Sequence, residues 1–258
     1  MRVRVLVNLS IQTSEILLNA AQSLVFVCAT RADAAGFAGT PTGQSIARVR
    51  FAAQVRLALA VQNKAGLPSI YNRAITPALR DAVLVFVHDD VWIDDVFFVQ
   101  HLLQGLAQYD VVGLAGNRRC LPEAPAWSFK NDGMAWDSDY LSGVVCHGPK
   151  PFGPPSVYGP VPSEVALLDG VLLAARCSTL LDAGVRFDER FDFHFYDLDF
   201  CRTARAAGLR LGTFSSGVTH VSGGSFGSPS WRAGLQRYRQ KWPVTQPVAP
   251  VAPLPKVA

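Results

Sequence analysis

Acidic side chains and a histidine follow directly after an apolar run in residues 83–95. The run VLVFV is typical of a strand buried on both faces of a parallel sheet, and the polar sequence His88-Asp89-Asp90 ends it. Ligands of open α/β sheets bind at the carboxyl ends of the strands, and charged groups beside a buried strand need partners. A divalent metal ion that carries a phosphate group would explain both the place and the chemistry of these residues.

His88 and Asp90 are two positions apart, so their side chains project to the same side of an extended segment. Asp90 offers an oxygen ligand suited to Mg²⁺ or Mn²⁺, and imidazole tolerates Mn²⁺. We therefore predict that Asp90 binds a metal ion, with His88 as a further candidate ligand. Asp94 and Asp95 are expected only to cap the helix that follows.

A second cluster lies in residues 187–208, where aromatic and polar side chains alternate before Asp197 begins a short helix. A carboxylate at a helix N-terminus is held ionised by the helix dipole. Asp197 is therefore either a helix cap or a general base, and the spacing does not separate these roles. His220, on a short polar strand before Ser-Gly-Gly-Ser, is a third candidate for the site.

The elements that must position these residues alternate between strand and helix, which predicts an α/β fold with a doubly wound sheet. Strands are expected at 2–10, 23–31, 83–87, 110–116, 165–175, 209–214 and 218–221. Helices are expected at 11–23, from Ser45 to before Gly66, at 97–109 and at 231–242. Residues 117–163 are expected to be irregular, which is typical of binding loops.

Two common nucleotide-binding motifs are missing from the sequence, since neither G-x-G-x-x-G nor G-x-x-x-x-G-K-[ST] occurs. A bound phosphate would therefore be held by a metal ion and by side chains.

In order and spacing, these segments resemble the GT-A glycosyltransferases, above all glycosyltransferase family 2. His88-Asp89-Asp90 stands where the family has Asp-x-Asp, with His in place of the first acid. The sequence Phe187-Asp188-Glu189, followed by Tyr196-Asp197, is similar to the element whose last acid is the catalytic base. The segment that lines the nucleotide pocket of the family is similar to the one containing Asn63, Gly66 and Asn72.

The resemblance implies a single GT-A domain with a Rossmann-like, mostly parallel central sheet flanked by helices. This domain would span residues 1–242, with a nucleotide-binding half at about 1–116 and an acceptor and catalytic half at about 117–242. Residues 243–258 are expected to form a Pro-rich mobile tail.

The resemblance also implies a metal-dependent, inverting glycosyltransferase of the hexosyltransferase type. It would move a sugar from a nucleotide-diphosphate sugar, with a UDP-sugar favoured, to a hydroxyl of a glycan or glycolipid in surface polysaccharide biosynthesis. The cofactor would be Mn²⁺ or Mg²⁺, acting as a Lewis acid and held by Asp90, His220 and His88. Asp197 would be the catalytic base.

The donor nucleotide would contact Thr30, Arg31, Asn63, Gly66, Asn72 and Asp89. The donor sugar and the acceptor would contact Trp136, Asp169, Gly170, Tyr196 and Lys241. Two departures from the family pattern bear on specificity. The strand at 23–31 does not end in the acid that often contacts the nucleotide base, so the identity of the nucleotide base stays open. Tyr196 stands where the family has Glu, which implies that the acceptor-binding part of the site differs from that of the family.

Composition favours a globular protein, since 49% of the residues are hydrophobic and 17% are charged. The net charge of +4 suits anionic ligands, but there is no block of Lys and Arg, so no nucleic acid partner is expected. Five cysteines without a C-x-x-C pair favour a reducing cytoplasm. The expected partners are a nucleotide-sugar donor and a glycan or lipid-linked glycan acceptor, and a peripheral contact at the inner face of the membrane stays open.

Two other functions remain alternatives. A nucleotidyltransferase also holds phosphates with metal ions, but it would show a glycine-rich, basic loop after the first strand, where this chain has Asn8-Leu9-Ser10. A non-catalytic domain that binds nucleotides or sugars stays open. The pair His88-Asp89 also occurs in HD-type phosphohydrolases, but those proteins are helical and this pair follows a strand pattern.

Overall fold

Strand β3 (Val83–Val87) lies inside a seven-stranded sheet in the computed structural model, which describes residues 23–224 and 226–243. All five of its side chains are buried, as its apolar run predicts. The strand expected at 2–10, nearly all of the helix expected at 11–23 and the Pro-rich tail from Val244 lie outside the described residues.

The large sheet has the strand order β2-β1-β3-β11-β5-β12-β9. Its strands are β2 (Gln54–Ala60), β1 (Ser23–Ala29), β3, β11 (Leu172–Arg176), β5 (Val111–Gly113), β12 (Leu211–Thr213) and β9 (Ser163–Val165). Strands β2, β1 and β3 are parallel, and β3 and β5 both pair antiparallel with β11, so they share one direction. Because β12 is parallel to β5, most of the sheet runs one way, as expected.

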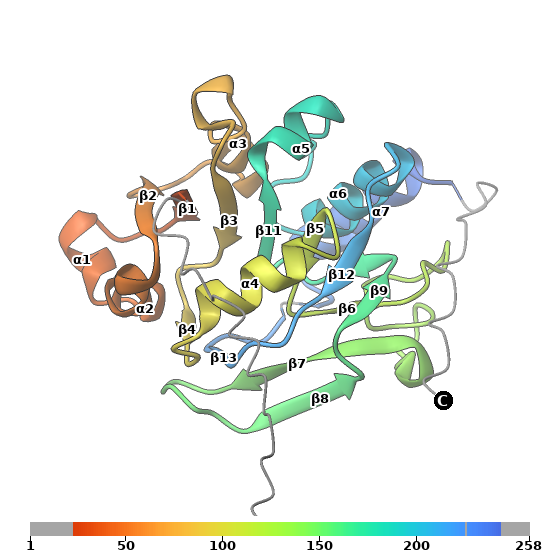
Figure 1. Cartoon of the computed structure of the whole chain (residues 1–258). Helices are drawn as coiled ribbons and strands as arrows, with labels where there is room; N and C mark the ends of the chain where they lie inside the picture. The colour runs from red at the N-terminus through yellow and green to blue at the C-terminus, as the bar shows by residue number, and fades with distance from the viewer. Residues whose placement is uncertain (1–22, 225, 244–258) are drawn as a thin grey trace, which may run out of the picture.

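A second sheet, of order β10-β6-β7-β13-β4, lies beside the first (Figure 1). Its strands are β10 (Leu167–Leu168), β6 (Ala115–Asn117), β7 (Leu141–His147), β13 (Val218–His220) and β4 (Val91–Ile93). Strand β8 (Pro155–Gly159) pairs antiparallel with β7 as a hairpin. The expectation that residues 117–163 are irregular is therefore wrong for their second half, where β7 and β8 pair across a turn rich in glycine and proline, residues 148–154.

Helices flank the central sheet, which confirms the α/β class. Figure 1 shows α1 and α2 beside β1 and β2, α4 across the middle, and α6 with α7 at the other end. The helices are α1 (Ala34–Ala38), α2 (Pro41–Val49), α3 (Leu67–Asn72), α4 (Phe98–Leu106), α5 (Cys177–Asp182), α6 (Tyr196–Ala206) and α7 (Pro229–Lys241). Short 3₁₀ turns are η1 (Arg50–Ala52), η2 (Pro77–Leu79) and η3 (Ser138–Tyr140). Among the described residues, no helix combines the length and the apolar character that crossing a membrane requires.

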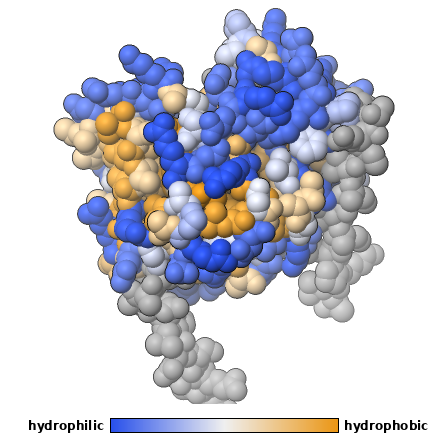
Figure 2. Space-filling view, turned by 90° about the horizontal axis from the view of Figure 1, so that it is seen from above, coloured by the Kyte–Doolittle hydropathy of each residue, from blue (hydrophilic) through white to orange (hydrophobic). Residues whose placement is uncertain are grey.

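The helix expected from Ser45 to before Gly66 is wrong, because α2 ends at Val49 and β2 follows the turn η1. In β2, Gln54 and Arg56 are exposed, whereas Val55 and Leu57 are half-buried, so the segment also fits the two-residue period of a strand. Parallel pairing with β1 along its whole length decides between the two patterns. Figure 2 shows apolar side chains at the surface on the side where Figure 1 places β1 and β2.

The start of α4 corrects both expected caps, since its cap position belongs to Phe97, which makes no side-chain cap. The carboxylate of Asp95 accepts a hydrogen bond from the N–H of Phe97 at 2.8 Å, in the turn before the helix. Asp94 instead accepts from the N–H of Phe152 at 2.9 Å and from the hydroxyl of Thr219. Asp94 therefore joins β4 to the β7–β8 hairpin and to β13, and it does not cap α4.

Aromatic side chains of α3, β3 and the segment before α6 pack against the start of α6. The rings of Phe187 and Phe200 stack with centroids 4.1 Å apart, and Phe86 of β3 lies edge-on to Phe187 at 5.0 Å. The ring of Tyr196 lies 6.0 Å from that of Phe187 and 5.8 Å from that of Tyr71. The acidic and aromatic segment that precedes α6 is thereby fixed against the central strand.

Candidate active site

Polar residues gather where β1, β2 and β3 end. Thr30 follows β1, Asn63 follows β2 and His88 follows β3, and the strands are neighbours. The N–H of Asn63 donates to the carbonyl of Thr30 at 2.8 Å. The N–H of His88 donates to the carbonyl of Val171 at 3.3 Å, which brings the loop before β11 to the same edge. The position matches the carboxyl-edge site expected for an open α/β sheet.

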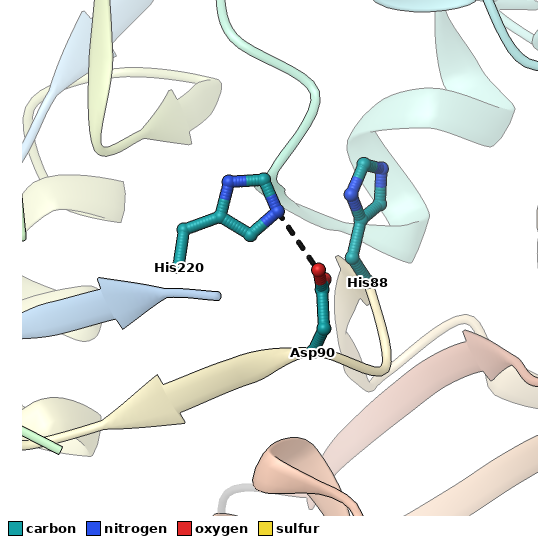
Figure 3. A group of neighbouring side chains, drawn as sticks. All are labelled: His88, Asp90 and His220. Atoms are coloured by element: carbon teal, nitrogen blue, oxygen red, sulfur yellow. Dashed lines mark ion pairs between the residues drawn. The ribbon is translucent and has the colours of Figure 1, made fainter. Parts of the chain in front are cut away.

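His88, Asp90 and His220 form a compact group of possible metal ligands (Figure 3). One ligand atom from each of them lies within 4.8 Å of the other two. His220 is brought there by the antiparallel pairing of β13 with β4, in which it is opposite Val91. Its Nε2 lies 3.2 Å from Oδ1 of Asp90, and Oδ2 of Asp90 accepts from the N–H of Ser222 at 3.1 Å.

The charges of this group are set by its neighbours. Burial tends to raise the pKa of Asp90, but the hydrogen bond and charge of His220 outweigh it and hold that pKa well below its usual range. Burial tends to lower the pKa of His220, but Asp90 raises it overall. Burial, together with the charge of His220, lowers the pKa of His88 to about 4. His88 is therefore neutral at physiological pH and has a free lone pair.

The donor atoms of these three residues fit a divalent transition metal. One carboxylate oxygen and two imidazole nitrogens suit Mn²⁺ or a similar ion better than Mg²⁺, which prefers oxygen ligands. Asp90 is ionised and His88 is neutral, as metal ligation requires.

Asp197 lies in the first turn of α6 and lines the same cavity as His88 and His220. It is not the cap of that helix, because the cap position belongs to Phe195. Its Oδ2 accepts a hydrogen bond from the N–H of Gly170 at 3.0 Å. Burial, reinforced by the nearby charge of Asp169, raises its pKa from 3.8 to about 7. A carboxylate with a pKa near neutrality is suited to accept a proton.

A cavity of about 260 Å³ connects these groups. Asp169, Asp197, His88 and His220 line it, and so do the predicted residues Gly170, Trp136 and Tyr196. Aromatic side chains complete much of the wall, namely Trp127, Tyr158, Phe193, Phe226 and Trp231. Trp136, which is 51% exposed, stacks on Tyr158 with an angle of 17° between the rings.

Two histidines of this cavity were not expected from the sequence. His147 ends β7, where it is paired in register with His220, and His194 precedes α6. Four of the five histidines of the chain thus line one cavity. Only the parallel pairing of β7 with β13 reveals His147, because that strand lies in a segment with no clear strand pattern.

The residues predicted to contact the nucleotide do not line this cavity in the described part of the chain. Thr30 is buried and Arg31 is exposed near Asn63, and Asp89 is half-buried beside the metal-ligand group. The amide of Asn63 bonds locally to the backbone of Ala65. These residues lie along the strand edge, and their contact with a nucleotide stays a prediction.

Gly66 and Asn72 have structural partners in the second predicted motif. A Cβ atom at Gly66 would lie 2.9 Å from the Cα of Asp192, so the two backbones approach closely. The side chain of Asn72 donates to the carbonyl of Phe187 at 2.9 Å and to Glu189 at 3.0 Å. It also accepts from the N–H of Phe187 at 3.0 Å. Both residues therefore hold the segment before α6 against α3.

Lys241 and Tyr196 are also engaged within the protein. The ammonium of Lys241 forms ion pairs of 2.7 Å with Asp188 and with the buried Asp199. The hydroxyl of Tyr196 has two hydrogen-bond partners, and the residue is 2% exposed. The predicted contacts of these two residues with substrate remain untested, and their observed contacts are structural.

Comparison with known proteins gives one extensive match. A family model described as "Glycosyltransferase like family" matches residues 44–222, which is more than half of the chain and includes His88, Asp90, Asp197 and His220. No curated protein sequence matches the chain significantly.

Three solved structures are similar in outline. TarS of S. aureus, solved with UDP, has 12% identity and a TM-score of 0.46 over 84% of this chain and 64% of that one. The mannosyltransferase PcManGT from Pyrobaculum calidifontis, solved with GDP-Man and Mn²⁺, has 14% identity and a TM-score of 0.48 over 85% of this chain and 63% of that one. A197 from STIV has 12% identity and a TM-score of 0.42 over 76% and 82%. This chain spans less than two thirds of the length of the TarS and PcManGT chains.

The free energy of unfolding of the variant D197N tests whether burial raises the pKa of the Asp197 carboxyl. Because the folded-state pKa is raised from 3.8 to about 7, the protonated acid stabilises the fold below pH 4 and that contribution is lost as pH rises through 7. We expect D197N to be more stable than the wild type above pH 7, by on the order of 2–4 kcal/mol, and the gap to close towards pH 4.

The measurement is urea unfolding of both proteins between pH 4 and 8.5, with EDTA present. D182N, at an exposed carboxylate paired with Arg80, is the control. A difference between D197N and the wild type that does not vary with pH would show that Asp197 titrates normally in the folded protein.

Proposed function

The chain belongs to the glycosyltransferase-like family, and from this premise we propose that it is a metal-dependent, inverting glycosyltransferase. The family resemblance of its motifs is confirmed by the match to residues 44–222. We propose a nucleotide-diphosphate sugar, with UDP as the favoured nucleotide, as donor and a sugar hydroxyl as acceptor. The observation that carries this proposal is that one cavity is lined by two members of the metal-ligand group, His88 and His220, and by Asp197, whose carboxyl has a raised pKa.

Asp197 is the proposed general base. Its Oδ2 is oriented by the N–H of Gly170 at 3.0 Å, and its carboxylate would accept a proton from the acceptor hydroxyl. As the hydroxyl oxygen attacks the anomeric carbon, its proton passes to Asp197 and the bond to the nucleotide phosphate breaks on the opposite face. A single displacement of this kind inverts the configuration at that carbon. A well-placed base contributes a rate factor of about 10²–10⁴.

Asp90, His88 and His220 are the proposed ligands of a divalent cation, with Mn²⁺ favoured over Mg²⁺ by the two imidazoles. A cation bound there would offset the negative charge that develops on the departing nucleoside diphosphate. Asp90 needs no deprotonation to bind it, because its carboxyl is already ionised at neutral pH. The nucleotide would extend along the strand edge toward Asp89, Asn63, Thr30 and Arg31.

The acceptor is proposed to enter between the aromatic wall and Asp197. Trp136 exposes half of its surface at the cavity, as a side chain that stacks on a sugar ring would. Asp169, whose carboxylate accepts a hydrogen bond from the N–H of Val171 at 3.3 Å, is proposed to bind sugar hydroxyls. The proposed acceptor is a glycan or lipid-linked glycan of surface polysaccharide biosynthesis. The cytoplasmic location is proposed from the free thiols of all five cysteines, and contact with the inner membrane face stays a prediction.

Removal of the proposed base gives the first test of this function. We expect D197N, assayed with UDP-sugars and Mn²⁺, to lose transfer by at least about 100-fold while its affinity for UDP changes little. The measurement is steady-state transfer together with calorimetry of UDP, and D182N is again the control. Near-normal turnover by D197N would remove Asp197 from the reaction.

Removal of the proposed metal ligand gives the second test. In calorimetry with and without Mn²⁺, the wild type is expected to bind UDP at least about tenfold more tightly with the metal, which corresponds to roughly 1.4 kcal/mol or more of binding free energy. D90A is expected to bind UDP equally in both conditions, because the carboxylate that anchors the cation is gone. If D90A keeps the full gain from Mn²⁺, the cation binds elsewhere.

A further inference from the structure

The hydroxyl of Tyr196 lies between two groups of the site. It is 2.8 Å from the carbonyl oxygen of Gly170 and 3.0 Å from Nε2 of His88. Because Tyr196 is 2% exposed, water does not compete for these bonds from outside. The sequence suggested a contact with the acceptor for this residue, but its polar atom faces the interior of the site.

Counting protons fixes the direction of both hydrogen bonds. A carbonyl oxygen can only accept, so the single proton of the Tyr196 hydroxyl is donated to Gly170. The contact with His88 therefore needs a proton on Nε2 of the imidazole, which donates to the phenol oxygen. In a neutral imidazole only one nitrogen carries a proton, so Nδ1 of His88 is left with a lone pair.

The orientation of the His88 ring agrees with this assignment. Figure 3 shows one ring nitrogen of His88 turned toward His220 and the other turned away from it. The face of the ring is held by Phe193, whose ring stacks on it with centroids 5.6 Å apart and an angle of 28°. The ring therefore has a fixed plane and a fixed tautomer before any ligand binds.

Tyr196 also ties this histidine to the proposed base. Its hydroxyl binds the carbonyl of Gly170, and Oδ2 of the next residue, Asp197, binds the N–H of the same glycine. A Cβ atom at Gly170 would meet the Tyr196 hydroxyl and lie 3.0 Å from the Cβ of Asp197, so only glycine fits there. Phe195, the residue before Tyr196, has a φ of +67°. This strained backbone conformation turns the side chains of Tyr196 and Asp197 toward Gly170.

We propose that Tyr196 is a positioning residue that fixes His88 as the Nε2-protonated tautomer and thereby presents Nδ1 to the cation. The proposal rests on the metal site of the proposed function, but its first part concerns the protein without metal. Hydrogen bonds of this kind to the second nitrogen of a ligand histidine typically affect metal affinity by 10–100-fold.

The tautomer can be read directly by ¹⁵N NMR of the imidazole in the metal-free wild type, recorded over a pH series so that the neutral form of His88 is identified from its own spectrum. The H88N spectrum identifies which signals belong to His88. We expect the pattern of a protonated Nε2 and an unprotonated Nδ1. A His88 protonated on Nδ1 would overturn the proposal, whether or not any variant folds.

The consequence for the metal is tested with Y196F and a matched control, Y109F. Tyr109 is a buried tyrosine that does not line the cavity, and its ring lies against the guanidinium of Arg210. We expect calorimetry to show Mn²⁺ binding to Y196F about 10-fold weaker or more, and binding to Y109F unchanged.

The outcomes separate this proposal from the proposed function. If the wild type binds Mn²⁺ and Y196F binds it equally well, Tyr196 does not position the ligand. If the wild type binds no Mn²⁺ at all, the proposed metal site fails, and the tautomer of His88 in the wild type still decides the role of Tyr196.

Discussion

The antiparallel pairing of β13 with β4 is the contact on which the candidate site depends. It places His220 beside Asp90, although 130 positions separate them in the sequence, and the resulting ion pair sets the charges of the whole group. Without it, Asp90 would lose both the ion pair with His220 and the hydrogen bond from the N–H of Ser222, which closely follows β13. The second sheet therefore completes a site that the large sheet only begins at the end of β3.

A second set of contacts relates the metal-ligand group to the proposed base. Gly170 is bound through its carbonyl by Tyr196 and through its N–H by Asp197. The helix that carries both residues is fixed from its other side by Lys241, which pairs with Asp188 and Asp199. Burial raises the pKa of Asp197, so the same packing that orders the site also costs stability when this acid ionises. A site of this kind is expected to trade stability for reactivity.

The sequence predicts the parts of this arrangement that have a strong local pattern. The run before His88 predicts a buried strand, and the acids after it mark the carboxyl edge. The positions of Asp90, Asp197 and His220 in one site follow from a resemblance of ordered motifs, and the structure does bring them together. Their chemical roles are still proposals.

What the sequence does not predict depends on contacts between distant segments. Strand β2 carries both a helical and an alternating pattern, and its pairing with β1 decides between them. His147 and Tyr158 come from a hairpin whose glycines and prolines hide its strands. The structural partners of Asn72 and Lys241 lie more than 50 positions away or on another helix, so their side chains looked free in the sequence.

The central claim is that His88, Asp90 and His220 bind one divalent cation in the cavity that holds Asp197. The most direct test is a crystal grown with Mn²⁺ and UDP, measured for anomalous scattering of manganese. We predict a single strong peak bonded to the Asp90 carboxylate, to Nδ1 of His88 and to a ring nitrogen of His220. A nucleotide bound in the crystal with no manganese peak among these three side chains would contradict the account.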